Sequence, residues 1–193
     1  MKLFTQFALL CSLGLPLSAH AQSEFHLQQQ TLANPDNEPA PVHPVPSPRQ
    51  LKWQETEFYA FFHYGMNTYT GLEWGNGDEN ENRFAPTRVP NPEQWLQAAK
   101  DAGMRGGIAV IKHHDGFCLW PTSSNPNAKQ NNIPRDFAEA ARKLNMKYGF
   151  YISPWDRNSA LYGTDRYVKE VFLRQCLEAA QYGNDQFEMW FDG

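Results

Sequence analysis

From residue 51 onward, strand-like and helix-like segments alternate, and this alternation restricts the possible folds more than any other feature of the chain. Short apolar runs predict strands at residues 57–62, 107–111, 148–152 and 187–191. Apolar residues spaced three or four apart predict helices between them, at about 91–103, 135–144 and 165–182. A strand-helix-strand order with right-handed crossovers gives a parallel sheet covered by helices. We therefore expect an α/β fold.

The predicted helices carry recognisable end signals. Asn91 and Pro92 mark the start of the first one, because Asn caps helices well and Pro is favoured at the first helical position. Gly103 marks its end. In the third helix, the stripe expected to face the core consists of Val168, Val171, Phe172, Cys176 and Ala179.

Polar or aromatic residues stand at the end of every predicted strand. They are His63, then His113 and His114, then Tyr151 with residues 153–156, and finally Trp190 and Asp192. A (β/α)₈ barrel assembles its active site from the carboxyl ends of successive strands, whereas no Gly-x-Gly-x-x-Gly follows the first strand to suggest a dinucleotide fold. We expect the first half of a (β/α)₈ TIM-type barrel, truncated after strand 4, and consider an open doubly wound sheet the alternative.

The first 50 residues predict an export signal and a linker. Lys2 precedes an apolar run from residue 3 to about 17, and Ala19 and Ala21 provide a signal-peptidase site, so residues 1–21 are expected to be a signal peptide. The apolar run is short for a membrane anchor, and a lipid anchor on Cys11 is disfavoured by the bulky residue before it. Residues 22–50 contain six prolines and predict an extended lead-in to a catalytic domain at 51–193. The protein is expected to be periplasmic or extracellular.

Charge and cysteine content exclude several classes of function. The formal net charge is −4, and it becomes −5 once the predicted signal peptide and its one lysine are removed. This mild acidity, with no long run of one sign, argues against nucleic acid or anionic membranes as partners. Only Cys118 and Cys176 would remain, so the chain is not a disulfide scaffold. One bridge between them is conceivable, but free buried thiols are the commoner outcome.

Five sequence blocks resemble the successive conserved blocks of family 29 α-L-fucosidases. They are FHYGMN (62–67), EWG (73–75), KHHDGFCLW (112–120), YISPWDRN (151–158) and WFDG (190–193). They occur in the family's order and with its spacing, over about residues 46–193. Many family members have Trp at the position of Tyr64 and Tyr at the position of Ile152. Residues 67–75 and 153–158 are most similar to the subgroup that prefers α-1,3- and α-1,4-linked fucose.

The resemblance implies a retaining exo-glycosidase without a cofactor or metal, whose substrate is a fucosylated oligosaccharide or glycoconjugate. Asp192 matches the family's nucleophile, and such a mechanism needs a second carboxylic acid about 5 to 5.5 Å away. The positions that match fucose contacts are His63, Glu73, Trp74, His113, His114, Tyr151 and Trp190. The family's acid/base carboxylate lies beyond Gly193, so we expect this chain to be a fragment that is inactive alone. Four strands would also leave two open sheet borders, which predicts poor folding in isolation.

Other interpretations of the same residues remain open. Asp192 could be a helix N-cap. His113, His114 and Asp115 could serve a metal-dependent hydrolase, although adjacent residues of a strand are expected to point to opposite faces. A non-catalytic carbohydrate-binding protein would also explain the aromatic residues. Asp115 itself is expected to organise a turn and to lie outside the site.

Overall fold

The computed structural model describes residues 43–124 and 131–193 of the 193-residue chain. The predicted signal peptide and most of the predicted lead-in therefore lie outside the described residues. Contacts divide the chain into two units, Met1–Gln50 and Leu51–Gly193. Within the described ranges, no helix has both the length and the apolar character needed to cross a membrane.

The end of the lead-in is helical, where the sequence predicted extended chain up to residue 50. Helix α2 spans Pro48–Gln54. Ser47 and Gln50 form a reciprocal capping box: the Ser47 amide donates to Gln50 Oε1 at 2.8 Å, and the Gln50 amide donates to Ser47 Oγ at 3.3 Å. Pro48 suits the first helical position, so local chemistry starts a helix inside the proline-rich segment.

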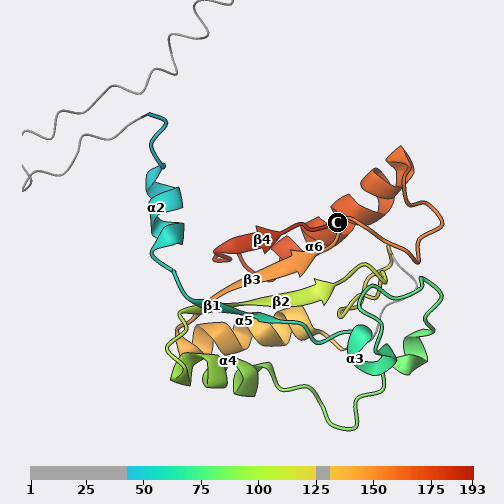
Figure 1. Ribbon diagram of the computed structural model, residues 1–193, viewed down its shortest axis with the longest axis horizontal. Helices are drawn as coiled ribbons and strands as arrows, with labels where there is room; N and C mark the ends of the chain where they lie inside the picture. The colour runs from blue at the N-terminus through green and yellow to red at the C-terminus, as the bar shows by residue number, and fades with distance from the viewer. Residues whose placement is uncertain (1–42, 125–130) are drawn as a thin grey trace, which may run out of the picture. The chain divides into compact units, whose positions relative to one another are not determined.

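The sheet contains four parallel strands in the order β1-β2-β3-β4 (Figure 1). Their bounds are Tyr59–Phe62, Gly106–Lys112, Lys147–Ile152 and Glu188–Trp190. The predicted α/β class is confirmed, and the consecutive order differs from the reversed order of a doubly wound sheet. The first strand starts two residues later than predicted because Glu57 has a φ of 53° and the Phe58 amide turns back to the Thr56 carbonyl.

The helices that follow the strands begin and end largely where the sequence signals predict. Helix α4 spans Pro92–Asp101, and the Asn91 side chain caps it by accepting from the Gln94 amide at 3.1 Å. Helix α5 spans Ile133–Leu144 and starts two residues early because Asn132 caps it in the same way. The long loop between β1 and α4 contains helix α3, Asn67–Thr70, and the 3₁₀ turn η1, Glu81–Arg83.

The third predicted helix begins with an irregular segment. A π-helix, η2, spans Tyr167–Phe172 and continues directly into helix α6, Leu173–Ala180. Each hydrogen bond of a π-helix joins residues five positions apart, so the three- and four-residue spacing used to choose the buried stripe does not hold there. Val171 and Ala179 are buried as predicted, but Val168 is 53% exposed, so its assignment to the stripe was wrong.

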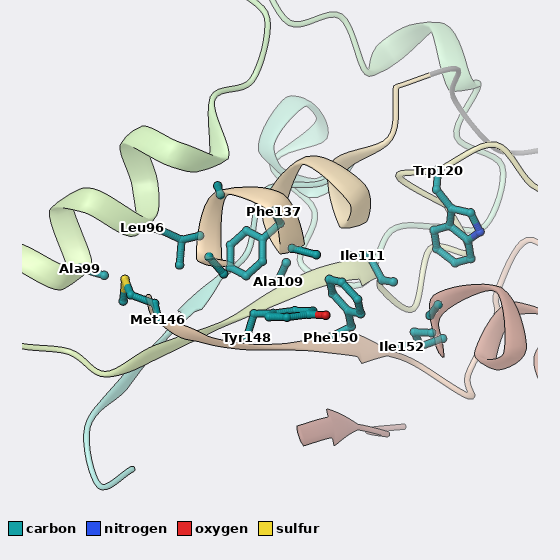
Figure 2. Packing of buried hydrophobic residues seen from close by; sticks show 14 of the residues in the cluster. Leu96, Ala99, Ala109, Ile111, Trp120, Phe137, Met146, Tyr148, Phe150 and Ile152 are labelled. Atoms are coloured by element: carbon teal, nitrogen blue, oxygen red, sulfur yellow. The ribbon is translucent and has the colours of Figure 1, made fainter. Parts of the chain in front are cut away.

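Helices α4, α5 and α6 cover one face of the sheet. A single buried cluster joins Leu96 of α4, Phe137 of α5 and Ala179 of α6 to side chains of β2 and β3 (Figure 2). The strand residues in this cluster are Ala109, Ile111, Tyr148, Phe150 and Ile152. Each large apolar side chain buried there contributes about 1.5 to 3 kcal/mol to folding. Cys118 is buried and Cys176 half-buried, and both are free thiols.

The opposite face is concave, because side chains of the first and last strands meet across it. The Phe61 and Trp190 rings have centroids 5.0 Å apart, and the Tyr59 and Phe187 rings lie 5.3 Å apart. In a flat sheet, β1 and β4 would be separated by three strand spacings, or about 14 Å. The sheet is therefore strongly curled, with its helices on the convex side.

Candidate active site

Three imidazole rings gather where β1 and β2 end. The ring centroids of His63 and His113 are 4.5 Å apart, and those of His113 and His114 are 4.0 Å apart. The expectation that adjacent residues 113 and 114 point to opposite faces was wrong. Strand β2 already ends at Lys112, and its pairing with β3 shifts by one residue between Val110 and Lys112, so the alternation stops before the histidines.

The predicted carboxylate lies at the same edge of the sheet. Tyr151, near the end of β3, donates a hydrogen bond from Oη to Asp192 Oδ2 at 2.8 Å. The Tyr151 ring also stacks on His113, with centroids 5.8 Å apart. Burial and then the Asp192 carboxylate raise the pKa of Tyr151, so the phenol keeps the proton that it donates. Trp190 lies two residues earlier in β4, against Phe61.

The imidazoles are neutral at neutral pH. The pKa of His113 is lowered to about 4, first by burial and then by the neighbouring His114 and His63, although the Glu73 backbone and Asp192 act in the opposite direction. Burial is also the largest cause of the lowered pKa values of His63 and His114. Neutral rings offer hydrogen bonds without placing positive charge beside the carboxylate.

Glu73 and Trp74 come to the site on the loop between α3 and η1. The Trp74 side chain is half exposed, and its ring lies 6.4 Å from the His114 ring. The charge of the Glu73 carboxylate acts to raise the pKa values of His63 and His114, against the larger effect of burial. Gly75, at a φ of 68°, lets the loop approach Asp115 so closely that a Cβ would lie 2.8 Å from that side chain. All seven predicted contact positions, with Asp192, thus belong to one region at the carboxyl ends of the strands.

The segment after β3 contributes residues that the sequence placed at the strand end but did not include among the predicted sugar contacts. The Ser153 hydroxyl lies 2.6 Å from His114 Nδ1, and the Trp155 ring lies 4.8 Å from the His114 ring and 5.7 Å from the Trp74 ring. Both follow β3 directly, and this position is the signal by which the sequence placed residues 153–156 at a strand end without assigning them a contact.

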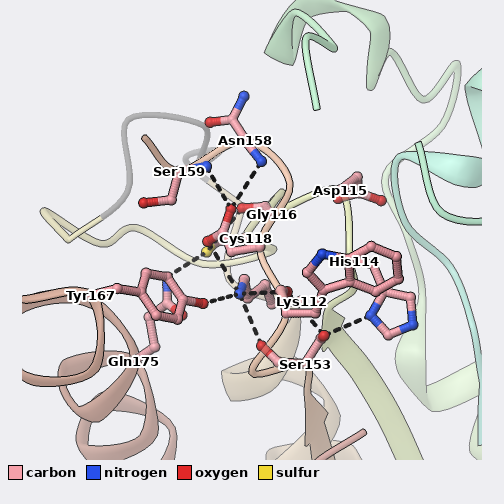
Figure 3. A network of polar contacts seen from close by, with 12 residues as sticks. Lys112, His114, Asp115, Gly116, Cys118, Ser153, Asn158, Ser159, Tyr167 and Gln175 are labelled. Carbon is pink, nitrogen blue, oxygen red and sulfur yellow. Dashed lines mark hydrogen bonds and ion pairs between the residues drawn. The ribbon is translucent and has the colours of Figure 1, made fainter. Parts of the chain in front are cut away.

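A buried ion pair supports this segment (Figure 3). Lys112 Nζ lies 3.2 Å from Asp156 Oδ2, and both side chains are fully buried. Lys112 also donates to the Ser153 carbonyl at 2.9 Å, the Tyr167 hydroxyl at 3.0 Å and the Trp155 carbonyl at 3.3 Å. The other Asp156 oxygen accepts from the amides of residues 158 and 159. The charges are therefore paired and hydrogen-bonded, as buried charges must be.

Asp115 has the structural role that the sequence predicted. Its Oδ1 accepts a hydrogen bond from the Phe117 amide at 2.7 Å and organises the turn around Gly116, which has a φ of 80°. Across residues 43–124 and 131–193, no group of three or more His, Cys, Asp or Glu side chains is arranged to hold a metal ion.

A four-stranded parallel sheet with polar and aromatic residues collected at the carboxyl ends of its strands is typical of the catalytic domain of an α/β enzyme. Comparison with known proteins gives the family. Residues 50–193 match the sequence profile described as Alpha-L-fucosidase. The chain belongs to this family, glycoside hydrolase family 29.

Individual relatives agree with this assignment. The chain is 39% identical over 163 residues to Alpha-L-fucosidase 1 of Arabidopsis thaliana, a match that covers 80% of this chain and 32% of the relative. A crystal structure of a family 29 glycoside hydrolase from an unknown rumen bacterium matches with 43% identity and a TM-score of 0.73, covering 78% of this chain and 28% of that one. A Ruminococcus gnavus family 29 fucosidase in complex with fucose matches with 29% identity and a TM-score of 0.68, covering 85% of this chain and 39% of that one. The chain spans about a third of the length of these relatives.

Proposed function

We propose that residues 51–193 are the first half of the (β/α)₈ barrel of an exo-acting α-L-fucosidase, which hydrolyses terminal α-L-fucosyl linkages of glycans with retention of configuration. Asp192 is the nucleophile. The observation that carries the proposal is the hydrogen bond between Tyr151 and Asp192 beside three neutral imidazoles. It places a carboxylate among hydrogen-bonding groups suited to sugar hydroxyls, in a chain of this family.

The reaction takes two displacements. An Asp192 oxygen attacks the anomeric carbon of fucose while a second carboxylic acid protonates the departing glycosidic oxygen, so a fucosyl ester replaces the glycosidic bond. Water, deprotonated by the same second group, then attacks the anomeric carbon and releases Asp192. The Tyr151 hydroxyl holds Asp192 Oδ2 at 2.8 Å, which orients the carboxylate and leaves Oδ1 to attack.

The surrounding side chains bind the sugar. His63, Glu73, His113 and His114 hydrogen-bond ring hydroxyls, while Trp74 and Trp190 pack on the apolar face of fucose. Because positive charge develops on the sugar ring in the transition state, neutral imidazoles are better neighbours than cationic ones. The lowered pKa of each of the three histidines supports this role.

The second carboxylic acid is supplied by residues outside 51–193. The relatives are about three times as long as the matched region, and in the described chain β1 and β4 each have a neighbouring strand on one side only. We propose that the other half of the barrel closes on these borders and that the 193-residue chain alone has no appreciable hydrolytic activity. An active, cooperatively unfolding preparation of the 193-residue chain would contradict this.

Two finer points belong to the same proposal. The resemblance of residues 67–75 and 153–158 to one subgroup supports a preference for α-1,3- and α-1,4-linked fucose on branched glycans. The pattern of residues 1–21 supports export by a signal peptide to the periplasm or the exterior.

Replacing Asp192 in the complete gene product tests the mechanism. Asp192→Gly should reduce turnover of an aryl α-L-fucoside by several orders of magnitude, and azide should restore part of the activity by forming a β-fucosyl azide. Asp165→Asn replaces an exposed carboxylate that takes part in none of the site contacts described above; it is the control and should retain activity. Full turnover in Asp192→Gly would refute the assignment of Asp192 as the nucleophile. Inactivation of the wild type by a chelator would favour the metal-dependent alternative. Binding of the fucoside by the wild type without turnover would favour a non-catalytic binding protein.

A further inference from the structure

The Ser153 hydroxyl stands between two partners. It lies 2.6 Å from His114 Nδ1 and donates to the Trp155 carbonyl at 2.9 Å. Ser153 is fully buried and His114 is 6% exposed, so water has little access to this contact. The arrangement lies directly behind a ring that the proposed function assigns to sugar binding.

The single hydrogen of the Ser153 hydroxyl determines the direction of its contact with His114. A serine hydroxyl has one hydrogen, and a carbonyl can only accept. Once that hydrogen is directed to the Trp155 carbonyl, the Ser153 oxygen can only accept from His114. Nδ1 of His114 must then carry the ring hydrogen, and in a neutral imidazole Nε2 is left as an acceptor.

The Lys112–Asp156 pair keeps the serine's partner in place. Lys112 donates to the carbonyls of both Ser153 and Trp155, so one ammonium group holds the peptide segment on either side of residue 154. Asp156 fixes that ammonium group from the next residue along the chain, at 3.2 Å. Since Lys112, Ser153 and Asp156 are buried, the Trp155 carbonyl cannot easily turn away from the Ser153 hydroxyl.

We propose that Ser153, held by the Lys112–Asp156 pair, is a positioning residue that fixes His114 in its Nδ1–H tautomer, so that His114 Nε2 accepts a hydrogen bond from a substrate hydroxyl. The proposal rests on the proposed function for the identity of the substrate. The tautomer itself depends only on the hydrogen-bond geometry. An acceptor nitrogen also selects for a ligand group that can donate, which a sugar hydroxyl can and an ether or methyl group cannot.

The tautomer can be measured directly. The complete gene product, labelled with ¹⁵N-histidine, is studied at neutral pH by long-range ¹H–¹⁵N correlation, and the His114 signals are identified by their loss in His114→Gln. We expect the Nδ1–H pattern for His114 in the wild type. An Nε2–H pattern would overturn the proposal, and this outcome requires no variant of Ser153 to fold.

Variants test whether Ser153 is responsible. In Ser153→Ala, His114 should shift partly or wholly to the Nε2–H tautomer, and kcat/KM should fall about tenfold, the effect of losing one well-placed hydrogen bond. Ser153→Thr retains the hydroxyl and should retain the tautomer. Ser159→Ala is the matched control: Ser159 Oγ accepts a hydrogen bond from the Leu161 amide at 3.3 Å, and its removal should leave the His114 tautomer unchanged. An unchanged tautomer in Ser153→Ala would refute the role of the serine.

Failure of this inference differs from failure of the proposed function. If Asp192→Gly abolishes turnover while Ser153→Ala changes neither the tautomer nor kcat/KM, only the positioning role is lost. If Asp192→Gly remains active, the proposed mechanism is lost, and the wild-type tautomer still decides the hydrogen-bond direction.

Discussion

The buried ion pair between Lys112 and Asp156 allows a quantitative prediction. Both side chains are fully buried and 3.2 Å apart. Lys112→Met removes the ammonium group that pairs with the buried Asp156 carboxylate, and the Ser153 carbonyl loses its Lys112 donor. Removing one partner of a buried pair destabilises a protein by about 3 to 5 kcal/mol. The unfolded population should therefore rise by roughly two to four orders of magnitude.

A double-mutant cycle separates the pair from general packing. Lys112→Met, Asp156→Asn and the double variant of the complete gene product are unfolded in urea and followed by tryptophan fluorescence. The double variant has no unpaired charge and should be more stable than the sum of the single effects predicts, by about 1 to 3 kcal/mol. Glu170→Gln breaks an exposed pair with Arg166 and should leave the urea midpoint nearly unchanged. Additive effects of the two buried substitutions would refute the reasoning.

Two further predictions concern the turn after β2. Gly116→Ala places a Cβ 2.3 Å from Asp156 Oδ1 at a φ of 80° and should lower the free energy of unfolding by about 2 to 5 kcal/mol. The control Gly163→Ala has a φ of 82° and no atom within 4 Å of the new Cβ, so it should cost only about 1 to 2 kcal/mol. Equal shifts of the thermal unfolding midpoint in the two variants would contradict this. Burial raises the pKa of Asp115 from 3.8 to about 6, so the stability that its protonated form contributes is present below pH 3.8 and is lost as the pH rises through 6. The stability of Asp115→Asn relative to the wild type should therefore increase over that range. An equal difference in unfolding free energy between the two proteins at pH 4 and at pH 8 would contradict this.

Local signals were sufficient to predict most of the fold. Asn91 and Pro92 determine the start of α4 through a side-chain cap, and apolar runs fully buried in the sheet identify β2 and β3. These features depend on residues within a few positions of each other. The π-helix at Tyr167–Phe172 was not predictable in this way. Its first residue, Tyr167, is buried and receives a hydrogen bond from Lys112, a partner 55 positions earlier.

The site was predicted from its residue types but not from its contacts. A lysine at the end of a buried strand gives no local sign that it will be buried, because the compensating carboxylate, Asp156, lies 44 residues later in the sequence. Likewise, nothing near Ser153 in the sequence indicates that its hydroxyl will meet His114, since the register of β2 and β3 brings them together. The rings of His113 and His114 lie on the same side because the register of β2 and β3 is irregular just before them. Residue patterns do not encode such an irregularity.

The curl of the sheet is what links the fold to the proposed chemistry. In a flat four-stranded sheet, the ends of β1 and β4 would lie about 14 Å apart, too far for one monosaccharide to contact both. Here Phe61 of β1 touches Trp190 of β4, and the charge of Asp192 reaches His113 at the end of β2. The same curl leaves Phe61 45% and Trp190 37% exposed on the concave face, where a complete barrel packs its interior layers. The geometry that draws Asp192 toward the imidazoles is thus the geometry that the proposed further strands would complete.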